Sequence, residues 1–327
     1  MLSIIMPVKN TQPFLKQCLE SVVNQTLQQW QLIAIDDHST DASLEILTGY
    51  ARQDKRIQVI ANEGKGVIAA LQTGYKNATG NFITRMDSDD INELHKYEHM
   101  VTHLKEKGPG YLALGQVKYF CETGVGQGFQ NYERWMNALI QQGNCFDEVY
   151  KECVVPSPCW MLHRTDFDRA GAFNSALYPE DYDLCFRMYQ HRLIPIACNE
   201  ILLHWRDYPN RTTRQVAHYQ GDAILSLKCH HFLNIDFDSQ KKLVLWGAGK
   251  RGKFIAQYLV SRNIHFDWIC NNENKIGHQI YGIVLRAEKI VNEIENKQII
   301  ISVSNAEEQK SIKRICSENN WETYHFC

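Results

Sequence analysis

The sequence predicts an α/β protein of two domains, a larger doubly wound sheet domain over residues 1–235 and a smaller α/β domain over residues 241–327. Short apolar runs alternate with segments of helical spacing along the first part of the chain, which is typical of a sheet with helices on both faces. Polar and acidic residues directly follow several of these runs. A glycine motif at residues 247–252 indicates a second unit of the same class.

The elements of the larger domain follow from apolar periodicity and from proline, glycine and capping residues. A first strand is expected at residues 2–6, which Pro7 ends, and a helix starts at Thr11 and Pro13. Further strands are expected at residues 31–35, 57–60, 82–86 and 111–120, with a strand pair at 194–205. Further helices are expected after Ser39-Thr40-Asp41, at residues 67–77, 91–107 and 132–142, from Glu180 to about Met188, and in a long segment up to Phe232.

The composition argues against several classes of protein. The net charge of −2 favours neither nucleic acid nor an anionic membrane surface as a partner. Eleven cysteines occur without a CxxC pair or a zinc-finger spacing, and no apolar run is long enough to cross a bilayer. We therefore expect a cytoplasmic protein with free thiols. Peripheral attachment to the inner face of the membrane and a homo-oligomer both stay open.

The acidic run after the apolar residues 82–84 is the strongest candidate for a site. Asp87, Asp89 and Asp90 place three carboxylates within four residues, where like charges repel and raise one another's pKa. A divalent cation removes that cost, and hard oxygen ligands suit Mg²⁺ or Mn²⁺. A nucleoside diphosphate would supply the remaining oxygens. The alternative is an acidic turn that only caps a helix.

Four polar segments are expected to meet at one edge of the sheet. They are Pro7-Val8-Lys9, Asp36-Asp37, the loop around Gly64, and residues 87–90, and each follows a predicted strand. In open α/β sheets the ligand lies in the crevice at the carboxyl ends of the strands. The sequence therefore predicts a single binding crevice built from these four segments.

Four motifs in order resemble inverting family 2 glycosyltransferases. They are SIIMPVKN at the start of the chain, IDDHSTD, RMDSDDI, and PEDYDLCFRM followed by LLHWR. The resemblance covers Met1 to about Arg214 and implies the GT-A fold, a doubly wound mixed sheet. It also implies transfer of a sugar from a nucleoside diphosphate sugar to an acceptor, with Mn²⁺ or Mg²⁺ as cofactor.

The resemblance also implies roles for residues on the nucleotide side. Asp37 would accept a hydrogen bond from the base, and the backbone at Pro7 and Val8 would border the base. The other residues that we expect near the nucleotide are all basic, namely Lys9, Lys65, Arg85 and Arg206.

By the same resemblance, Asp87 would face the ribose and the metal ion, and Asp89 would bind the metal ion directly. Asp181 would be the general base, and Glu180 would orient it or help to bind the acceptor. The chemistry agrees, because inversion needs a base to deprotonate the attacking hydroxyl and positive charge to stabilise the leaving diphosphate. A carboxylate near the sugar would also stabilise an oxocarbenium-like transition state. The alternative for Glu180 and Asp181 is a plain pair of residues that cap a helix.

The chain departs from the family pattern at two places. The family often has an aromatic residue where Lys9 stands, and it often has a histidine in the late loop where Trp205-Arg206-Asp207-Tyr208 stands. Tyr208 is a poor metal ligand at neutral pH, since an unperturbed tyrosine has a pKa of about 10. His204 should point to the opposite face of a strand. Arg206 can bind a diphosphate through its planar guanidinium group.

The second domain carries GxGxxG at Gly247, Gly249 and Gly252, between a strand at residues 243–246 and a helix at 253–262. Further strands are expected at residues 265–270 and 298–303, and a helix at 310–318. The motif is typical of a dinucleotide site, but Asn271-Asn272 stand where an acidic residue would bind the ribose. Packing, dimerisation or ligand sensing are the other roles that we consider.

We therefore predict a metal-dependent inverting glycosyltransferase of polysaccharide biosynthesis. It would transfer a hexosyl or N-acetylhexosaminyl group from a UDP-sugar to a glycan or lipid-linked acceptor. Two alternatives stay open from the sequence. One is an NAD(P)-dependent oxidoreductase that uses the second glycine motif, and the other is a non-catalytic glycan-binding protein on the same fold.

Overall fold

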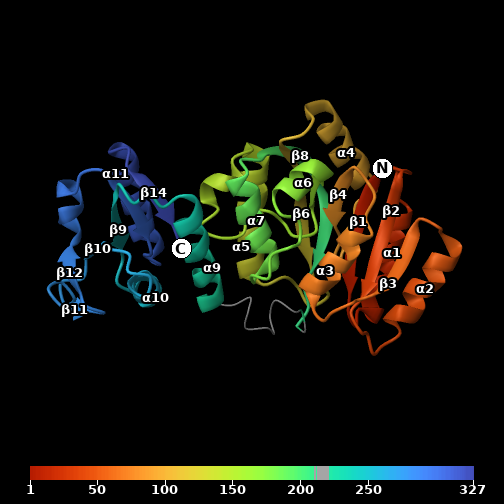
Figure 1. Ribbon diagram of the computed structural model, residues 1–327, viewed down its shortest axis with the longest axis horizontal. Coiled ribbons are helices and arrows are strands. Elements are labelled where there is room, and N and C mark those ends of the chain that lie inside the picture. Colours follow the sequence, from red (N-terminus) through yellow and green to blue (C-terminus); the bar gives the residue numbers. More distant parts are fainter. Residues whose placement is uncertain (210, 212–220) are drawn as a thin grey trace. The chain divides into compact units, whose positions relative to one another are not determined.

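A computed structural model describes residues 1–209, 211 and 221–327 and divides the chain into two compact units (Figure 1). The first unit comprises Met1–Asp147 and Cys153–Gln215, and the second comprises Glu148–Glu152 and Val216–Cys327. Helix α9 (Gly221–Ile235) therefore groups with the second unit, although the sequence suggested a boundary after residue 235. The part of the predicted long helix that precedes Gly221 lies outside the described residues, as does Arg214.

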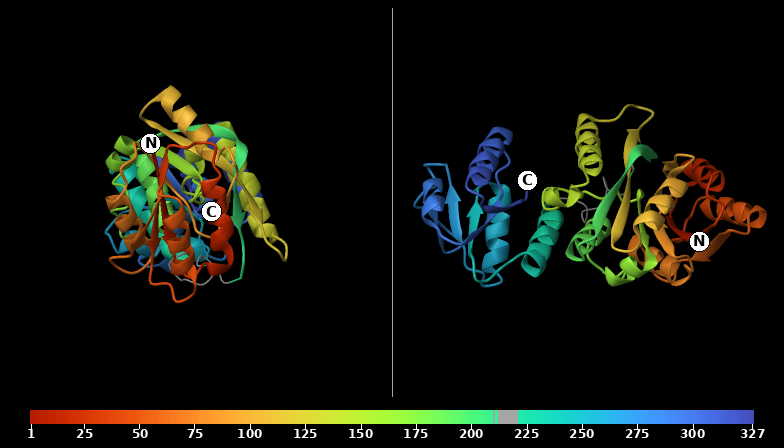
Figure 2. Two further views of the ribbon diagram at one scale, coloured as in Figure 1. Left: turned by 90° about the vertical axis from the view of Figure 1, so that its right-hand side faces the viewer. Right: turned by 90° about the horizontal axis from the view of Figure 1, so that it is seen from above.

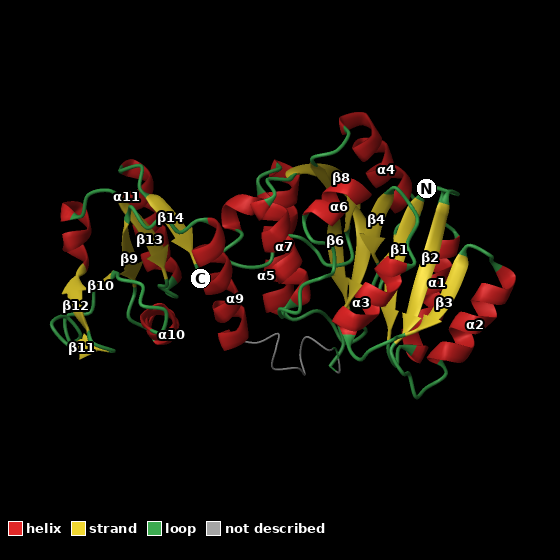
Figure 3. Cartoon of the chain, viewed as in Figure 1, coloured by secondary structure: helices red, strands yellow, loops and turns green. Residues whose placement is uncertain are grey.

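The first unit is built on a mixed sheet of eight strands, in the order β3-β2-β1-β4-β7-β6-β8-β5 (Figure 3). The three strands at its N-terminal side are parallel to β4, whereas β7 is antiparallel to both β4 and β6. Strand β6 is parallel to β8, and β5 is antiparallel to β8. The strands are β1 (Leu2–Val8), β2 (Trp30–Asp36), β3 (Ile57–Ala61), β4 (Phe82–Arg85), β5 (Ile91–Asn92), β6 (Tyr111–Phe120), β7 (Trp160–His163) and β8 (Ile194–Arg206).

Helices cover both faces of this sheet (Figure 2), as the alternating sequence pattern predicted. The apolar residues of β1, β2 and β4 are almost completely buried, which is expected for central strands between two helical layers. The helices are α1 (Gln12–Val23), α2 (Ser43–Gln53), α3 (Val67–Lys76), α4 (Lys96–Lys107), α5 (Gln127–Gln142), α6 (Arg164–Arg169) and α7 (Glu180–Gln190), and a 3₁₀ turn covers Cys145–Glu148. These elements confirm the predicted α/β class with a mixed sheet.

Three predicted elements were wrong in detail. The segment at 91–107 is not one helix, because Ile91 and Asn92 first pair with His204 and Leu203 of β8 and the helix starts only at Lys96. The predicted strand pair at 194–205 is the single strand β8, which keeps its pairing with β6 through register shifts near Gly115. Helix α5 starts five residues before the predicted position.

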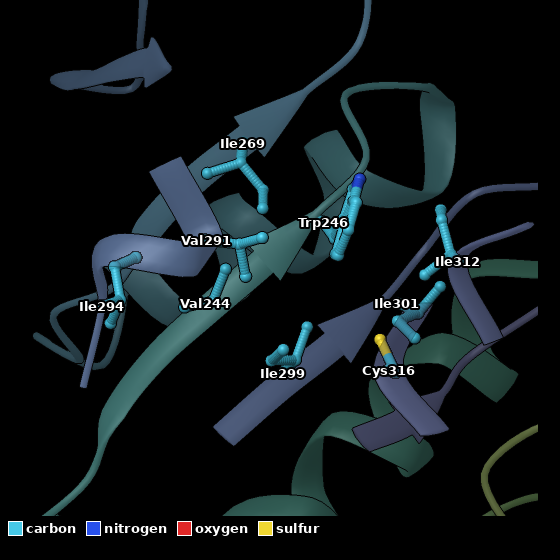
Figure 4. Packing of buried hydrophobic residues seen from close by; sticks show 9 residues of the cluster. All are labelled: Val244, Trp246, Ile269, Val291, Ile294, Ile299, Ile301, Ile312 and Cys316. Carbon is cyan, nitrogen blue, oxygen red and sulfur yellow. The ribbon is translucent and has the colours of Figure 1, made fainter. Parts of the chain in front are cut away.

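The second unit is a six-stranded sheet in the order β11-β12-β10-β9-β13-β14, parallel except for the short β11. The side chains of β9, β10 and β13 form its apolar core together with Val291, Ile312 and Cys316 (Figure 4). Its elements after α9 are β9 (Lys242–Trp246), α10 (Lys250–Val260), β10 (Asp267–Cys270), β11 (Gln279–Ile280), β12 (Ile283–Ala287), the 3₁₀ segment Glu288–Glu293, β13 (Lys297–Ile301), α11 (Ala306–Glu318) and β14 (Glu322–His325).

The glycine motif lies between β9 and α10, as predicted, and close packing explains two of its three glycines. Gly247 has a φ of +122°, and a Cβ at Gly252 would lie 2.2 Å from the carbonyl oxygen of Gly247. A Cβ at Gly249 would meet no heavy atom within 4 Å. The close approach of β9 and α10 therefore requires glycine at positions 247 and 252, with or without a ligand at the motif.

A short segment from the middle of the chain belongs to the second unit. The ring of Tyr150 stacks on Phe326 with 5.2 Å between ring centroids and 2° between planes, and its hydroxyl donates to Asp236 Oδ2 at 2.5 Å. Phe232 of α9 packs edge-on against Tyr150. The second unit is thus assembled from two separate stretches of chain.

The remaining sequence-based expectations concern membranes and thiols. Among the described residues, no helix combines the length and the apolar character needed to cross a bilayer. All eleven cysteines are free thiols, and most of them are buried, as predicted.

Candidate active site

Asp37, directly after β2, is held by hydrogen bonds from residues that follow β1 and β3. Its Oδ1 accepts from Asn62 Nδ2 at 2.6 Å and from the backbone N of Gly66 at 3.0 Å, and its Oδ2 accepts from Lys9 Nζ at 3.0 Å. Burial alone would raise the pKa of Asp37, but the hydrogen bonds from Asn62, Lys9 and Gly66 outweigh it and lower the pKa. Asp37 is therefore a fixed, ionised acceptor at the edge of the sheet.

Arg85, at the end of β4, joins the acidic run to the start of α7. Its Nε donates to Asp87 Oδ1 at 2.7 Å and its Nη1 donates to Glu180 Oε1 at 3.0 Å. Burial would lower the pKa of Arg85, but the charges of Asp87, Glu180 and Asp181 raise it. A single buried cation thus holds together carboxylates that are almost a hundred residues apart in the sequence.

Asp181 lies in the first turn of α7, beside Glu180, and it is partly buried. Burial and the charge of Glu180 raise the pKa of Asp181 to about 7, while Arg85 opposes the rise. A cavity of about 10 Å³, room for about one water molecule, is lined by both carboxylates, by Arg85 and by Ser157. A carboxylate with a pKa near neutrality is suited to proton transfer at neutral pH.

Tyr178 is influenced by charges from both the Asp37 loop and the start of α7. Burial and the charges of Glu180 and Asp37 raise the pKa of its phenol. Its hydroxyl oxygen would lie 3.7 Å from a Cβ at Gly66. Asp37 and Glu180 therefore both lie close enough to act on the same side chain, and the single crevice expected from the sequence stays a prediction.

Asp89 and Asp90 lie at the other end of the acidic run, next to the end of β8. Asp89 Oδ2 accepts from the Tyr208 hydroxyl at 2.9 Å, and Asp90 Oδ1 accepts from the backbone N of Arg206 at 2.8 Å. Burial, together with the neighbouring carboxylates, raises the pKa of both Asp89 and Asp90, although Arg211 opposes the rise. The ionised forms of Asp89 and Asp90 are thus unfavourable in this environment, and added positive charge would stabilise them.

Arg206 is placed differently from the diphosphate-binding role that the sequence suggested. Its Nε donates to the backbone O of Asp89 at 2.7 Å and its Nη2 donates to Gln17 Oε1 at 2.7 Å. Only 8% of the residue is exposed. The guanidinium group thus donates its hydrogen bonds within the protein, and one of them holds the backbone of the acidic run at Asp89.

The other predicted residues divide into buried backbone positions and exposed cations. Val8 is buried and its backbone O accepts from the backbone N of Asp37, whereas Pro7 is partly exposed. Lys65 is exposed, and 58% of the Lys9 side chain is exposed despite its ion pair with Asp37. His204 contacts Glu93 on the solvent side, as expected for the face opposite to the acidic run.

Sequence reasoning missed Lys96, which is fully buried beneath the acidic run. Its Nζ donates to Asn92 Oδ1 at 2.7 Å and to the backbone O of Pro158 at 2.6 Å. Burial lowers its pKa, and the charges of Cys159, Asp90 and Asp87 oppose this change. Asp90 Oδ2 is buried without a hydrogen-bond partner among the described residues, so Lys96 compensates part of its charge at longer range.

The acidic residues fit a hard divalent cation. Among the described residues no group of three or more His, Cys, Asp or Glu side chains converges on one metal position. Mg²⁺ and related ions are often held by only one or two carboxylates together with substrate phosphates and water. Asp89 and Asp87 have the hard carboxylate oxygens of that pattern and stand two residues apart in one acidic run.

The model of the family described as glycosyl transferase family 2 matches residues 3–171, more than half of the chain. The chain belongs to glycosyl transferase family 2. This glycosyltransferase is 28% identical over 234 residues to an uncharacterized glycosyltransferase of Haemophilus influenzae, across 70% of its own length and 72% of that relative. It is 40% identical over 122 residues to glycosyltransferase GlyA of Streptococcus pneumoniae, but that match covers only 37% of the chain and 17% of GlyA.

Solved structures share the fold of this family 2 glycosyltransferase at low identity. TarS 1–349 of S. aureus in complex with UDP-GlcNAc has a TM-score of 0.56 and 16% identity, over 79% of this chain and 71% of that chain. The mannosyltransferase PcManGT of Pyrobaculum calidifontis, in complex with GDP-Man and Mn²⁺, has a TM-score of 0.52 and 14% identity, over 71% and 63%. The predicted family, fold and enzyme class are thus confirmed.

Proposed function

We propose that this glycosyltransferase is a metal-dependent inverting enzyme. It transfers a hexosyl or N-acetylhexosaminyl group from a UDP-sugar to a glycan or lipid-linked acceptor. The observation that carries the proposal is the chain of contacts from Asp87 through Arg85 to Glu180, beside Asp181 with its pKa of about 7. Through these contacts, acidic residues suited to a cation are linked to a base suited to proton transfer.

The nucleotide side supports a nucleoside diphosphate sugar as donor. Asp37 is an ionised acceptor that can receive a hydrogen bond from the N–H of a nucleobase. Both oxygens of Asp37 already have partners, and the exposed Lys9 is the partner that can move away. TarS and PcManGT, which share the fold, bind UDP-GlcNAc and GDP-Man, the latter with Mn²⁺. We infer the same class of donor here.

Asp181 acts in this mechanism as the general base. It takes the proton of the acceptor hydroxyl as that oxygen attacks the anomeric carbon and the diphosphate leaves from the opposite side. Burial and the charge of Glu180, which Arg85 holds in place, raise the pKa of Asp181 to about 7, which suits proton transfer near neutral pH. Asp89 and Asp87 would hold a divalent cation, which supplies positive charge for the leaving diphosphate when bound.

The second unit does not carry a separate chemistry in this proposal. Packing already requires Gly247 and Gly252, so the motif gives no specific support for an oxidoreductase. Packing, dimerisation or ligand sensing stay the roles that we propose for this unit. The cytoplasmic location, the peripheral membrane association and the homo-oligomer stay predictions.

Asp181→Asn tests the assignment of the base. The variant should bind UDP as the natural protein does, while release of UDP from UDP-sugars falls by about 10²–10⁴-fold, the usual loss for a general base. Asp222→Asn is the control, because Asp222 lies in the first turn of a helix of the other unit. Retained turnover in Asp181→Asn would show that another residue is the general base. Binding of NADH by the natural protein, without binding of UDP, would favour the oxidoreductase.

A further inference from the structure

The end of β8 is bonded to the acidic run at three points. The backbone N of Arg206 donates to Asp90 Oδ1 at 2.8 Å, and its Nε donates to the backbone O of Asp89 at 2.7 Å. Two residues further on, the Tyr208 hydroxyl donates to Asp89 Oδ2 at 2.9 Å. Backbone and side chain of Asp89 are therefore both held from the same side.

The two side chains that hold Asp89 are themselves fixed. The Arg206 guanidinium lies 4.6 Å from the ring centre of Phe14 and 4.5 Å from that of Phe120, and it also bonds Gln17. The Tyr208 ring packs on Phe14 with 4.9 Å between centroids. Such stacked, hydrogen-bonded side chains have little rotamer freedom left, so they can fix the direction in which a neighbour points.

The contact with Tyr208 uses only one oxygen of Asp89. Among the described residues no side chain donates to Asp89 Oδ1, so the bond at Oδ2 restricts the rotation of the carboxylate and leaves Oδ1 without a side-chain donor. Partners that hydrogen-bond a metal-ligating carboxylate typically change metal affinity by about 10- to 100-fold when they are removed. Tyr208 stands in the sequence where the family often has a histidine, yet its hydroxyl contacts Asp89.

We propose that Tyr208 and Arg206 are positioning residues that orient Asp89 toward a divalent cation, so that Tyr208 acts on the cation through Asp89 and is not itself a ligand. The inference rests on the proposed metal dependence. It assigns Arg206 a role that needs no contact with the diphosphate.

The test uses the full chain with Mn²⁺ and UDP as probes. Tyr208→Phe removes one hydroxyl and keeps the ring on Phe14, and Arg206→Lys keeps the charge but loses the bonds to Asp89 and Gln17. Each has a matched control elsewhere in the first unit. Tyr75→Phe removes another tyrosine hydroxyl that donates to an aspartate, Asp168. Arg56→Lys changes another arginine that stacks on an aromatic ring, Trp30, and pairs with an aspartate.

Calorimetric titration of UDP at increasing Mn²⁺, with the electron paramagnetic resonance signal of free Mn²⁺ as a second readout, measures the effect. In Tyr208→Phe and Arg206→Lys the Mn²⁺ concentration for half-maximal UDP binding should rise about 10- to 100-fold. UDP binding without metal should stay unchanged, because Asp37 is not altered. Both controls should behave as the natural protein does.

Three results would overturn the inference. A Tyr208→Phe variant with unchanged Mn²⁺ dependence removes the positioning role, and it decides the question even where Arg206→Lys does not fold. Tighter Mn²⁺ binding by Tyr208→Phe would make the phenol a competitor of the cation. If Mn²⁺ has no effect on UDP binding by the natural protein, the proposed metal dependence itself fails and the inference fails with it.

Discussion

Replacing Glu180 by glutamine should move the pH dependence of donor turnover to lower pH. Burial and the charge of Glu180 raise the pKa of Asp181 from 3.8 to about 7, and Arg85 opposes the rise. A general base works only when it is deprotonated. Turnover of the natural protein should therefore fall about tenfold for each pH unit below about 7.

The size of the displacement follows from the balance of these causes. The rise from 3.8 to about 7 corresponds to about 4 kcal/mol that disfavours the ionised form. Burial is the largest cause, so we expect Glu180 to account for about one pKa unit, or ~1.4 kcal/mol. The glutamine side chain of the Glu180→Gln variant can still accept from Arg85 Nη1, which lies 3.0 Å from Glu180 Oε1 in the natural protein. The charge of Arg85 would then act more strongly on Asp181, which lowers its pKa in the same direction.

The assay is release of UDP from a saturating UDP-sugar with Mn²⁺ between about pH 5 and pH 9. The acid limb of the Glu180→Gln profile should lie about one pH unit below that of the natural protein. Glu133→Gln is the control, because Glu133 is also a buried glutamate with a cationic partner, Lys118. An acid limb that stays in place, or that moves to higher pH, would refute the electrostatic role of Glu180.

Two further predictions concern the nucleotide side and the second unit. Lys9→Met should bind UDP more tightly, by at most about fivefold, because the ligand no longer has to displace the exposed Lys9 side chain from the buried Asp37. Weaker binding in calorimetry would instead show that Lys9 contacts the nucleotide. Gly252→Ala should lower the free energy of unfolding by about 3 kcal/mol or more, because its Cβ would lie 2.2 Å from a backbone oxygen. Gly249→Ala, with open space at that position, should stay within about 0.5 kcal/mol in the same denaturant titration, and equal stability of the two variants would contradict the packing argument.

The sequence predicted those parts of the site that depend on local order along the chain. Strand ends followed by Asp37 or by Asp87 lie at one edge of a sheet whatever the details of the loops, so their place could be inferred. The link between Arg85 and Glu180 could not, because it joins positions almost a hundred residues apart through a buried ion pair. The sequence analysis did not single out Lys96, and only the tertiary packing shows that it is buried.

The errors in the elements have a similar origin. Ile91 and Asn92 form a strand because their backbone pairs with that of β8. Their own hydrophobic pattern does not indicate a strand. Arg206 was expected near the diphosphate, since nothing in the sequence shows that the rings of Phe14 and Phe120 lie 4.6 Å and 4.5 Å from its guanidinium group. In both cases the deciding partner comes from a distant part of the chain, which patterns of local hydrophobicity do not report.

The stacking of Tyr150 on Phe326 has a practical consequence for domain exchange. Because residues 148–152 belong to the second unit, a single cut after Asp236 would separate Tyr150 from Tyr324 and Phe326 and would also separate α9 from the rest of its unit. A chimera that swaps the C-terminal unit between relatives should therefore carry two grafts, the tail from Gly221 onward and the five-residue insert. A chimera joined at a single position would combine Tyr150 of one protein with the C-terminal aromatic residues of another, and the two sets of rings would not be matched.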